Sequence, residues 1–460
     1  MTDGPVRQAS LREHNLGLVL RQVASRAPGP GRRLAGDGRA PEKEAARPPS
    51  RADIAAATSL TRATVSALVD DLISGGLLTE VEPAPRAGAG RPAAGLVLST
   101  SGPAGLGLEI NVDYLSACVV DLAGTVRHRD VRHADQRPGR PDQVLAEVAG
   151  LAADARAHAE REGLVLAGAA LAVPGLVTPA GVVRLAPNLG WRDVDVPAGL
   201  AAGLARSGPR SEASAVGRAA GLARSDPRSE ATRPDRAGHL RHPASEASAA
   251  SRAALDGLPV TVDNEANLAA LGELHAGPAG PASFLYVSGE IGIGAGIVLH
   301  GALFRGARGW SGELGHMAVR PDGPACRCGA RGCLEQYAGQ EAILRAAGAD
   351  DLLPQAEAGN PAVLDALASA GEALGVAVAG VVNLLDVEAV VLGGIYAPLA
   401  AWLRPAVEAE IHRRVLTAAW SPVAVRPSVL GADAAVVGAA GSVVRTIQNH
   451  PARWLTRTVS

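Results

Sequence analysis

Three of the four cysteines of this 460-residue chain stand within one eight-residue segment, Cys326-Arg-Cys328-Gly-Ala-Arg-Gly-Cys333. His316 precedes this segment by ten residues. Zinc prefers four tetrahedral nitrogen or sulfur ligands, so one histidine and three cysteines make a closed structural set. The two glycines inside the segment let the backbone bend tightly enough to bring the sulfur atoms together. The sequence therefore predicts a zinc site at His316, Cys326, Cys328 and Cys333. The alternative is three reduced cysteines in an ordinary loop.

The rest of the sequence bears on location and on broad class. Cys118 lies in an apolar segment and is expected in the core. The first residues, Met1-Thr-Asp-Gly, lack the basic and apolar regions of a signal peptide, so we expect a cytoplasmic protein whose clustered cysteines bind metal. The longest apolar stretch, residues 374–392, is interrupted by Asn, Asp and Glu, which predicts a helix and a buried strand and no membrane span.

Residues 1–100 are predicted to form a winged helix-turn-helix DNA-binding domain. Apolar residues recur at helical spacing over residues 10–25, and two short helices are expected at Arg51–Thr58 and Arg62–Ser74, joined by a tight turn. Leu96-Val-Leu98 is typical of the returning strand of a wing. Residues 26–49 are rich in Pro, Gly, Arg and Ala without periodicity, which predicts a disordered insertion.

The second of these helices is expected to read DNA. A formal net charge of −2 means that DNA binding must rely on a local patch. Side chains near the helix start can reach base edges in the major groove, and the extended Gly-Arg-Pro at residues 90–92 can place its arginine in a narrow minor groove. The alternative is a small helical protein-interaction module. The predicted DNA contacts are Arg51, Thr61, Arg62, Thr64, Ser66, Arg86 and Arg91.

From residue 105 to 447 the pattern changes to alternating strands and helices, which predicts a separate α/β domain. Residues 205–254 interrupt it with a low-complexity segment that contains a near-repeat, Gly203 to Ser214 against Gly221 to Thr232. These copies have too little apolar content to bury, so we expect a disordered surface insertion. Residues 448–460 are predicted to be a C-terminal tail.

Several motifs of the α/β domain occur together in one order. They are Val173-Pro-Gly175, Ala186-Pro-Asn188-Leu-Gly-Trp191, Asp263-Asn-Glu-Ala-Asn267, Gly292-Ile-Gly-Ala-Gly296 and Gly312-Glu-Leu-Gly-His316, followed by the cysteine segment and Glu335. This combination resembles the ROK family (repressors, open reading frames and kinases), and the N-terminal helix-turn-helix resembles its repressor branch. The resemblance covers about residues 10–25, 50–200 and 255–447.

The resemblance implies an actin/hexokinase-like fold, with two α/β lobes around a cleft that holds a sugar, and a homodimer or homotetramer. It implies that His316 uses one ring nitrogen for zinc and the other for the sugar. Asparagine, histidine and carboxylates suit the hydroxyl groups of a sugar in a concave polar site. The sugar-binding residues implied by position are Asn188, Asn264, Glu265, Glu313, His316 and Glu335.

The kinase pattern of the family is broken at three places. The first phosphate loop reads Glu109-Ile-Asn-Val-Asp-Tyr114, without its glycines and lysine, and Glu290 stands in the second loop. Glu265 occupies the position of the catalytic aspartate, one methylene too long, so we predict no catalytic residue. We therefore expect a sensor whose affinity for an operator in double-stranded DNA depends on a sugar or a sugar phosphate. The alternatives are an active, glucokinase-like sugar kinase with a DNA-binding domain, or a scaffold in which neither site works.

Overall fold

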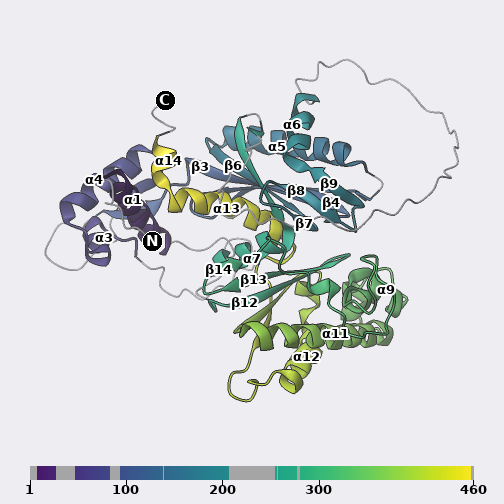
Figure 1. Cartoon of the computed structure of the whole chain (residues 1–460). Coiled ribbons are helices and arrows are strands. Elements are labelled where there is room, and N and C mark those ends of the chain that lie inside the picture. The colour runs from purple at the N-terminus through teal and green to yellow at the C-terminus, as the bar shows by residue number, and fades with distance from the viewer. Residues whose placement is uncertain are drawn as a thin grey trace, which may run out of the picture.

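The computed structural model describes residues 8–26, 47–82, 94–137, 139–206, 254–255, 257–276 and 280–456. The predicted contacts Arg86 and Arg91 and nearly all of both predicted insertions lie outside these residues. Four parts of the chain are laid side by side: an N-terminal unit, a first lobe, a pair of central helices and a second lobe (Figure 1).

The N-terminal unit has the element order of a winged helix-turn-helix. It consists of α1 (Gln8–Ala24), α3 (Arg51–Thr58), α4 (Arg62–Ser74) and the antiparallel strands β1 (Leu78–Val81) and β2 (Gly95–Leu98). Ser50 begins α3 with a capping box, because its side chain accepts from the Asp53 amide while the Asp53 carboxylate accepts from the Ser50 amide. Ser59 takes a left-handed backbone conformation, φ 58°, which sharpens the turn into α4.

The first lobe is built on a six-stranded mixed sheet. The strand order is β10-β11-β6-β3-β4-β5. The strands are β3 (Pro103–Ile110), β4 (Tyr114–Asp121), β5 (Val126–His133), β6 (Val165–Val173), β10 (Ala254–Leu255) and β11 (Leu258–Asn264). Helices α5 (Pro141–Arg161) and α6 (Val196–Arg206) cover its outer face (Figure 1). A small sheet of β7 (Leu176–Val177), β8 (Val182–Ala186) and β9 (Trp191–Asp195) lies near the cleft.

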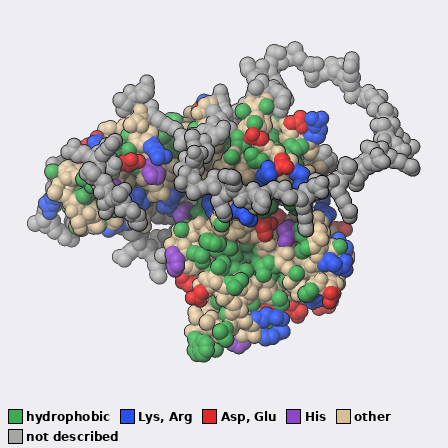
Figure 2. All heavy atoms as spheres, viewed as in Figure 1, with side chains coloured by type: hydrophobic (Ala, Val, Ile, Leu, Met, Phe, Trp, Pro, Cys, Tyr) green, Lys and Arg blue, Asp and Glu red, His purple; other side chains and the backbone are tan. Residues whose placement is uncertain are grey.

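The second lobe has a five-stranded sheet in the order β14-β13-β12-β15-β16. The strands are β12 (Phe284–Gly289), β13 (Ile293–Leu299), β14 (Ala302–Phe304), β15 (Ala389–Gly394) and β16 (Ala424–Pro427). Its helices are α8 (Glu335–Ala338), α9 (Gln340–Ala347), α10 (Leu353–Glu357), α11 (Pro361–Leu385) and α12 (Tyr396–Arg414). Hydrophobic side chains gather on the exposed face of this lobe, with charged ones around its edges (Figure 2).

Helix α11 is the one helix in the described ranges that is long and apolar enough to cross a membrane. Its apolar residues pack into the core of the second lobe, where Leu367, Leu374 and Val378 are completely buried. The helix therefore has the burial of a core helix.

Two helices lie between the sheets. Helix α13 (Ala434–Asn449) packs on β3 and β6, and α7 (Glu265–Ala276) packs on β12 and β13, while the two helices also contact each other. Their close approach requires glycine, because a Cβ atom on Gly438 would lie 1.9 Å from the carbonyl oxygen of Leu268. This arrangement places the start of α7 directly at the boundary between the lobes.

The predicted C-terminal tail is wrong. Helix α13 continues to Asn449, and α14 (Pro451–Leu455) follows it and packs on the N-terminal unit. The Trp454 indole Nε1 donates to the carbonyl oxygen of Gly75 at 3.0 Å, and Trp454 is only 7% exposed. The sequence did not predict the packing of α14, because the sequence around Trp454 does not indicate which distant residue it contacts.

Candidate functional site

A polar pocket opens between the two lobes, and all six of the predicted sugar-binding residues line it. On the side of the first lobe, the pocket residues come from the loop after β8, from the end of β11 and from the start of α7. The second lobe supplies the short 3-10 helix η1 (Leu314–His316), the residue before it and the first residue of α8. In that order, these residues are Asn188, Asn264, Glu265, then His316, Glu313 and Glu335.

Asn264 is held in place by the start of α7. Its side-chain oxygen accepts from the backbone amides of Ala266 at 2.9 Å and Asn267 at 3.3 Å, and its Nδ2 donates to the carbonyl oxygen of Gly175 at 3.0 Å. The adjacent Asp263 forms an ion pair with Arg305, which follows β14 in the second lobe. The amide group is thus oriented before any ligand arrives, and the two lobes are tied together beside it.

Gly292 makes room for two of the polar side chains. A Cβ atom at this position would lie 2.7 Å from Asn188 Nδ2 and 2.9 Å from Glu335 Oε2. A hydrogen bond between Asn188 and Glu335 opposes the rise in the Glu335 pKa that burial causes. Glycine at 292 therefore lets side chains from both lobes meet over the backbone of the second lobe.

The deep end of the pocket is acidic. Burial raises the pKa of Glu265 to about 8, and repulsion from Glu109 and Glu313 adds to the rise. Burial likewise raises the pKa of Glu109 to about 7, although hydrogen bonds from Tyr114 and Ser116 oppose it. The pKa of Glu290 is raised well above its usual value by burial, and then by Glu109 and Asp113. At neutral pH such surroundings favour the protonated forms of Glu265 and Glu290.

Behind the pocket, where the phosphates of a nucleotide would be expected from the family pattern, little space remains. Glu109, Glu265 and Glu290 surround a cavity of about 10 Å³, roughly the minimum for one water molecule. Glu290 Oε1 lies only 2.5 Å from the position that a Cβ atom on Gly394 would take. The Glu290 carboxylate thus occupies the space over this glycine.

Asn111 was not identified from the sequence as a site residue, yet it lines both the pocket and the cavity behind it. It is 6% exposed, and its Oδ1 accepts from the amide of Val112 at 2.6 Å. The available signal was a polar residue between Ile110 and Val112, at the end of a strand that is otherwise buried.

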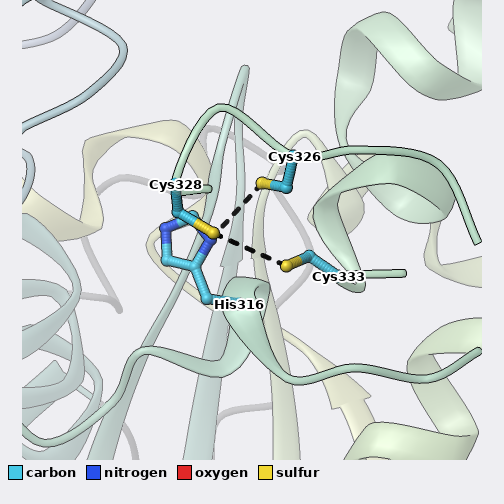
Figure 3. Close-up of side chains that lie close together, drawn as sticks. All are labelled: His316, Cys326, Cys328 and Cys333. Carbon is cyan, nitrogen blue, oxygen red and sulfur yellow. Dashed lines mark hydrogen bonds between the residues drawn. The ribbon is translucent and has the colours of Figure 1, made fainter. Parts of the chain in front are cut away.

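The metal-type cluster is assembled as predicted. One ligand atom from each of His316, Cys326, Cys328 and Cys333 lies within 4.8 Å of the others. The His316 Nδ1 is 3.8 Å from Cys326 Sγ, and the sulfur atoms of Cys328 and Cys333 are 3.7 Å apart (Figure 3). Two tetrahedral ligands of zinc, with zinc–sulfur distances of about 2.3 Å, lie roughly 3.8 Å apart. The donor set and its spacing therefore fit zinc, and Nδ1 of His316 is the nitrogen that would bind it.

The helix-turn-helix residues divide into two groups. Thr61 caps α4 by accepting from the Thr64 amide at 3.1 Å, and Arg62 is exposed at the first position of the helix. Ser66 is half-buried one turn further on. These residues lie at the start and in the first turns of α4.

Arg51 does not fit the predicted DNA contact. Its guanidinium group forms ion pairs with Asp70 at 2.7 Å and Glu80 at 2.9 Å, and it donates to the carbonyl oxygen of Ser66. These contacts join α3 to α4 and β1. Because two carboxylates already neutralise the charge of Arg51, we do not include it among the proposed DNA contacts.

Fold and site together define a two-lobed protein of the sugar-kinase type, with a polar interlobe pocket beside a Cys₃His cluster and a helix-turn-helix unit at its N-terminal end. The model of the ROK family matches residues 251–445. A glucokinase of Streptomyces coelicolor is 31% identical over 211 residues, which are 40% of this chain and 67% of the glucokinase. The chain belongs to the ROK family.

Two further comparisons extend beyond the kinase-like domain. The xylose repressor of Bacillus subtilis (strain 168) is 25% identical over 405 residues, which cover 86% of this chain and 91% of the repressor. The crystal structure of a ROK family transcriptional regulator, a homolog of the E. coli MLC protein, aligns with 97% of this chain and 99% of its own, with a TM-score of 0.68 and 22% identity. A ROK family glucokinase from Streptomyces griseus, crystallised with glucose and AMPPNP, aligns with 74% of this chain, with a TM-score of 0.55 and 23% identity.

Proposed function

We propose that this chain is a sugar-responsive transcriptional repressor of carbohydrate metabolism. One observation carries the proposal: the polar pocket between the lobes and a helix-turn-helix unit whose Arg62 is exposed at the start of α4 are parts of a single chain. The extent of the alignment with the xylose repressor supports it, because that alignment covers far more of the chain than the glucokinase alignment does. Xylose is therefore the first effector to test. The operator is double-stranded DNA, and a dimer or tetramer would match a palindromic operator.

The sugar would be held by side chains with complementary hydrogen-bonding capacity. Glu265, Glu313 and Glu335 accept hydrogen bonds from hydroxyl groups, whereas Asn188 and the free Nε2 of His316 can donate or accept. Since η1 and α8 flank the cysteine cluster, zinc at this cluster would fix the positions of Glu313, His316 and Glu335. We propose a structural role for zinc, which supplies no chemistry to the bound sugar.

The same cleft is poorly suited to phosphoryl transfer. Such a reaction requires neutralisation of the phosphate charge, and the lining of the small cavity behind the pocket contains Glu109, Glu265 and Glu290 but no Lys or Arg among the described residues. We therefore propose that the chain binds sugar without phosphorylating it. The competing function is an active sugar kinase, and sugar-dependent ADP release with a turnover of roughly 1–100 s⁻¹ would establish it.

The central experiment measures DNA binding and its response to sugar in the same preparation. The full chain is titrated, by fluorescence anisotropy, onto DNA from upstream of its own gene, with and without each sugar of a panel that includes xylose. Glu313→Ala should keep DNA affinity and lose the sugar response, whereas Arg62→Ala should lose DNA affinity and still bind sugar in calorimetry. Specific DNA binding that no sugar alters would contradict the sensor proposal.

Metal analysis tests the proposed zinc site independently. The purified protein should contain about one zinc ion per chain, and Cys333→Ser should lose both zinc and sugar affinity. Cys118→Ala is the matched control, because Cys118 lies in the core of the first lobe, outside the cluster. A metal-free protein that binds sugar with unchanged affinity would contradict the structural role.

A further inference from the structure

The charges around the pocket are of one sign. Four carboxyl groups line it, those of Glu265, Glu290, Glu313 and Glu335, and no Lys or Arg occurs among its described lining residues. His316 is the one lining side chain that can carry positive charge, and its Nδ1 faces Cys326. A ligand that enters this pocket therefore meets several carboxyl groups and no Lys or Arg. Burial favours the protonated forms of Glu265 and Glu290 in the empty pocket, and a cationic ligand would favour their ionised forms.

No positively charged side chain among the described residues pairs with the carboxyl group of Glu109, which lies behind the pocket. Glu109 is 3% exposed, and the hydroxyl groups of Tyr114 and Ser116 donate to its carboxylate at 2.8 Å and 3.1 Å. Both donors are neutral. Arg129, the guanidinium group with an attractive effect on Glu109, is paired at 2.6 Å with Asp433. Within the described ranges, the acidic end of the pocket thus has no ion pair of its own.

One buried carboxyl oxygen in this region lacks a hydrogen-bond partner among the described residues. The Oε2 atom of Glu265 is shut off from solvent and has no hydrogen-bond partner within the part of the chain that the structure describes. A buried polar atom without a hydrogen-bond partner destabilises the folded protein. A donor carried by the ligand would satisfy it. Positive charge on that donor would also relieve the repulsion between Glu265 and Glu109, whereas a phosphate group would add to the repulsion.

We propose that the pocket selects its sugar by charge: it binds an amino sugar, with the ammonium group toward Glu265 and Glu290, more tightly than the matching neutral sugar, and it rejects sugar phosphates. This inference rests on the proposed sugar-sensing function and specifies the class of effector. An ammonium group close to a carboxylate is attracted to it, and the attraction strengthens where water is excluded. Part of this gain is lost to desolvation, and we expect a net preference of about tenfold or more.

The test uses the purified full chain and isothermal titration calorimetry. Glucose, mannose and xylose are compared with their 2-amino-2-deoxy forms and their terminal monophosphates, and the two hexoses also with their 6-amino-6-deoxy forms. The measured quantity is the ratio of the affinities of the amino sugar and its neutral parent in the same protein. Because this ratio is internal to each protein, a general loss of affinity does not change it. Glu290→Gln and Glu265→Gln should each lower the ratio toward one, and Glu372→Gln, an exposed change on α11, should leave it unaltered.

The outcomes separate this inference from the function beneath it. At least one amino sugar should bind about tenfold more tightly than its parent, and the monophosphates should bind at least tenfold more weakly. Neutral sugars that bind as well as every amino form, or a monophosphate that binds best, would overturn charge selection and leave the sugar sensor intact. If none of these compounds binds, both the inference and the sugar-sensing proposal fail.

Discussion

Replacement of Glu265 by glutamine should make the protein more stable at alkaline pH, although it alters a residue at the centre of the pocket. Glutamine has nearly the same shape as a protonated glutamate, so the change removes the ionised form and little else. Burial, followed by the charges of Glu109 and Glu313, raises the pKa of Glu265 from 4.5 to about 8. The folded protein therefore holds this proton more tightly than the unfolded chain does.

The sign of the effect follows from this difference. Between pH 4.5 and about 8 the folded state binds more protons at this site than the unfolded state, so the contribution of Glu265 to the free energy of unfolding falls as pH rises. One pH unit corresponds to about 1.4 kcal/mol, and the whole interval sets an upper limit of about 5 kcal/mol. Relaxation and water entry reduce the cost of a buried charge, and we expect Glu265→Gln to gain about 1–2 kcal/mol at pH 8.

Thermal melting from pH 5 to pH 9 measures the difference. The melting temperature of Glu265→Gln should exceed that of the natural protein by roughly 1–3 °C at pH 8, and the two should converge near pH 5. Any pH-dependent loss of metal affects both proteins, so the difference at each pH isolates Glu265. Glu372→Gln provides the control, because this side chain is exposed. A gain that is equal at all pH values, or a loss at pH 8, would refute the assignment of a buried, proton-holding carboxyl group.

Three further changes test other parts of the structure. Gly292→Ala should weaken sugar binding in calorimetry while the circular dichroism spectrum stays the same, because its Cβ would lie 2.7 Å from Asn188 Nδ2 and force that side chain to move; full affinity would show that the pocket tolerates the side chain. Arg62→Ala should weaken specific DNA binding by about 1–3 kcal/mol and relax the preference at one base pair in a binding-site selection; an equal loss on all sequences would reduce Arg62 to a phosphate contact. Trp454→Phe should lower the free energy of unfolding by about 1 kcal/mol in urea titrations, since it removes the hydrogen bond to Gly75; unchanged stability would mean that this bond contributes nothing.

The starts of α3 and α4 could be predicted from the sequence, because they depend on residues next to each other in the chain. Ser50 and Thr61 are side chains that favour helix starts, and α3 and α4 begin directly after them. The residues that line the pocket could be named because their motifs resemble those of the ROK family in kind and in order. Partners far apart in sequence could not be predicted: Arg51 pairs with Glu80, and Asp263 pairs with Arg305, through contacts that folding alone creates. Asn111 was missed for the same reason, since its exposure to the pocket depends on how the two lobes close.

The helices that end the chain have a consequence for engineering. Side chains of α1, α4 and α14 belong to one continuous hydrophobic cluster that extends through α13 to the sheets of both lobes, and His450 pairs with Glu13. A chimeric biosensor that exchanges only the first hundred residues would remove one side of this cluster and leave Trp454 and Leu455 without their counterparts. A transplant that includes α1 to β2 together with α14 keeps the counterparts of Trp454 and Leu455, while α13 stays with the lobes on which it packs. For recombination, the practical module is thus the two ends of the chain taken as a pair.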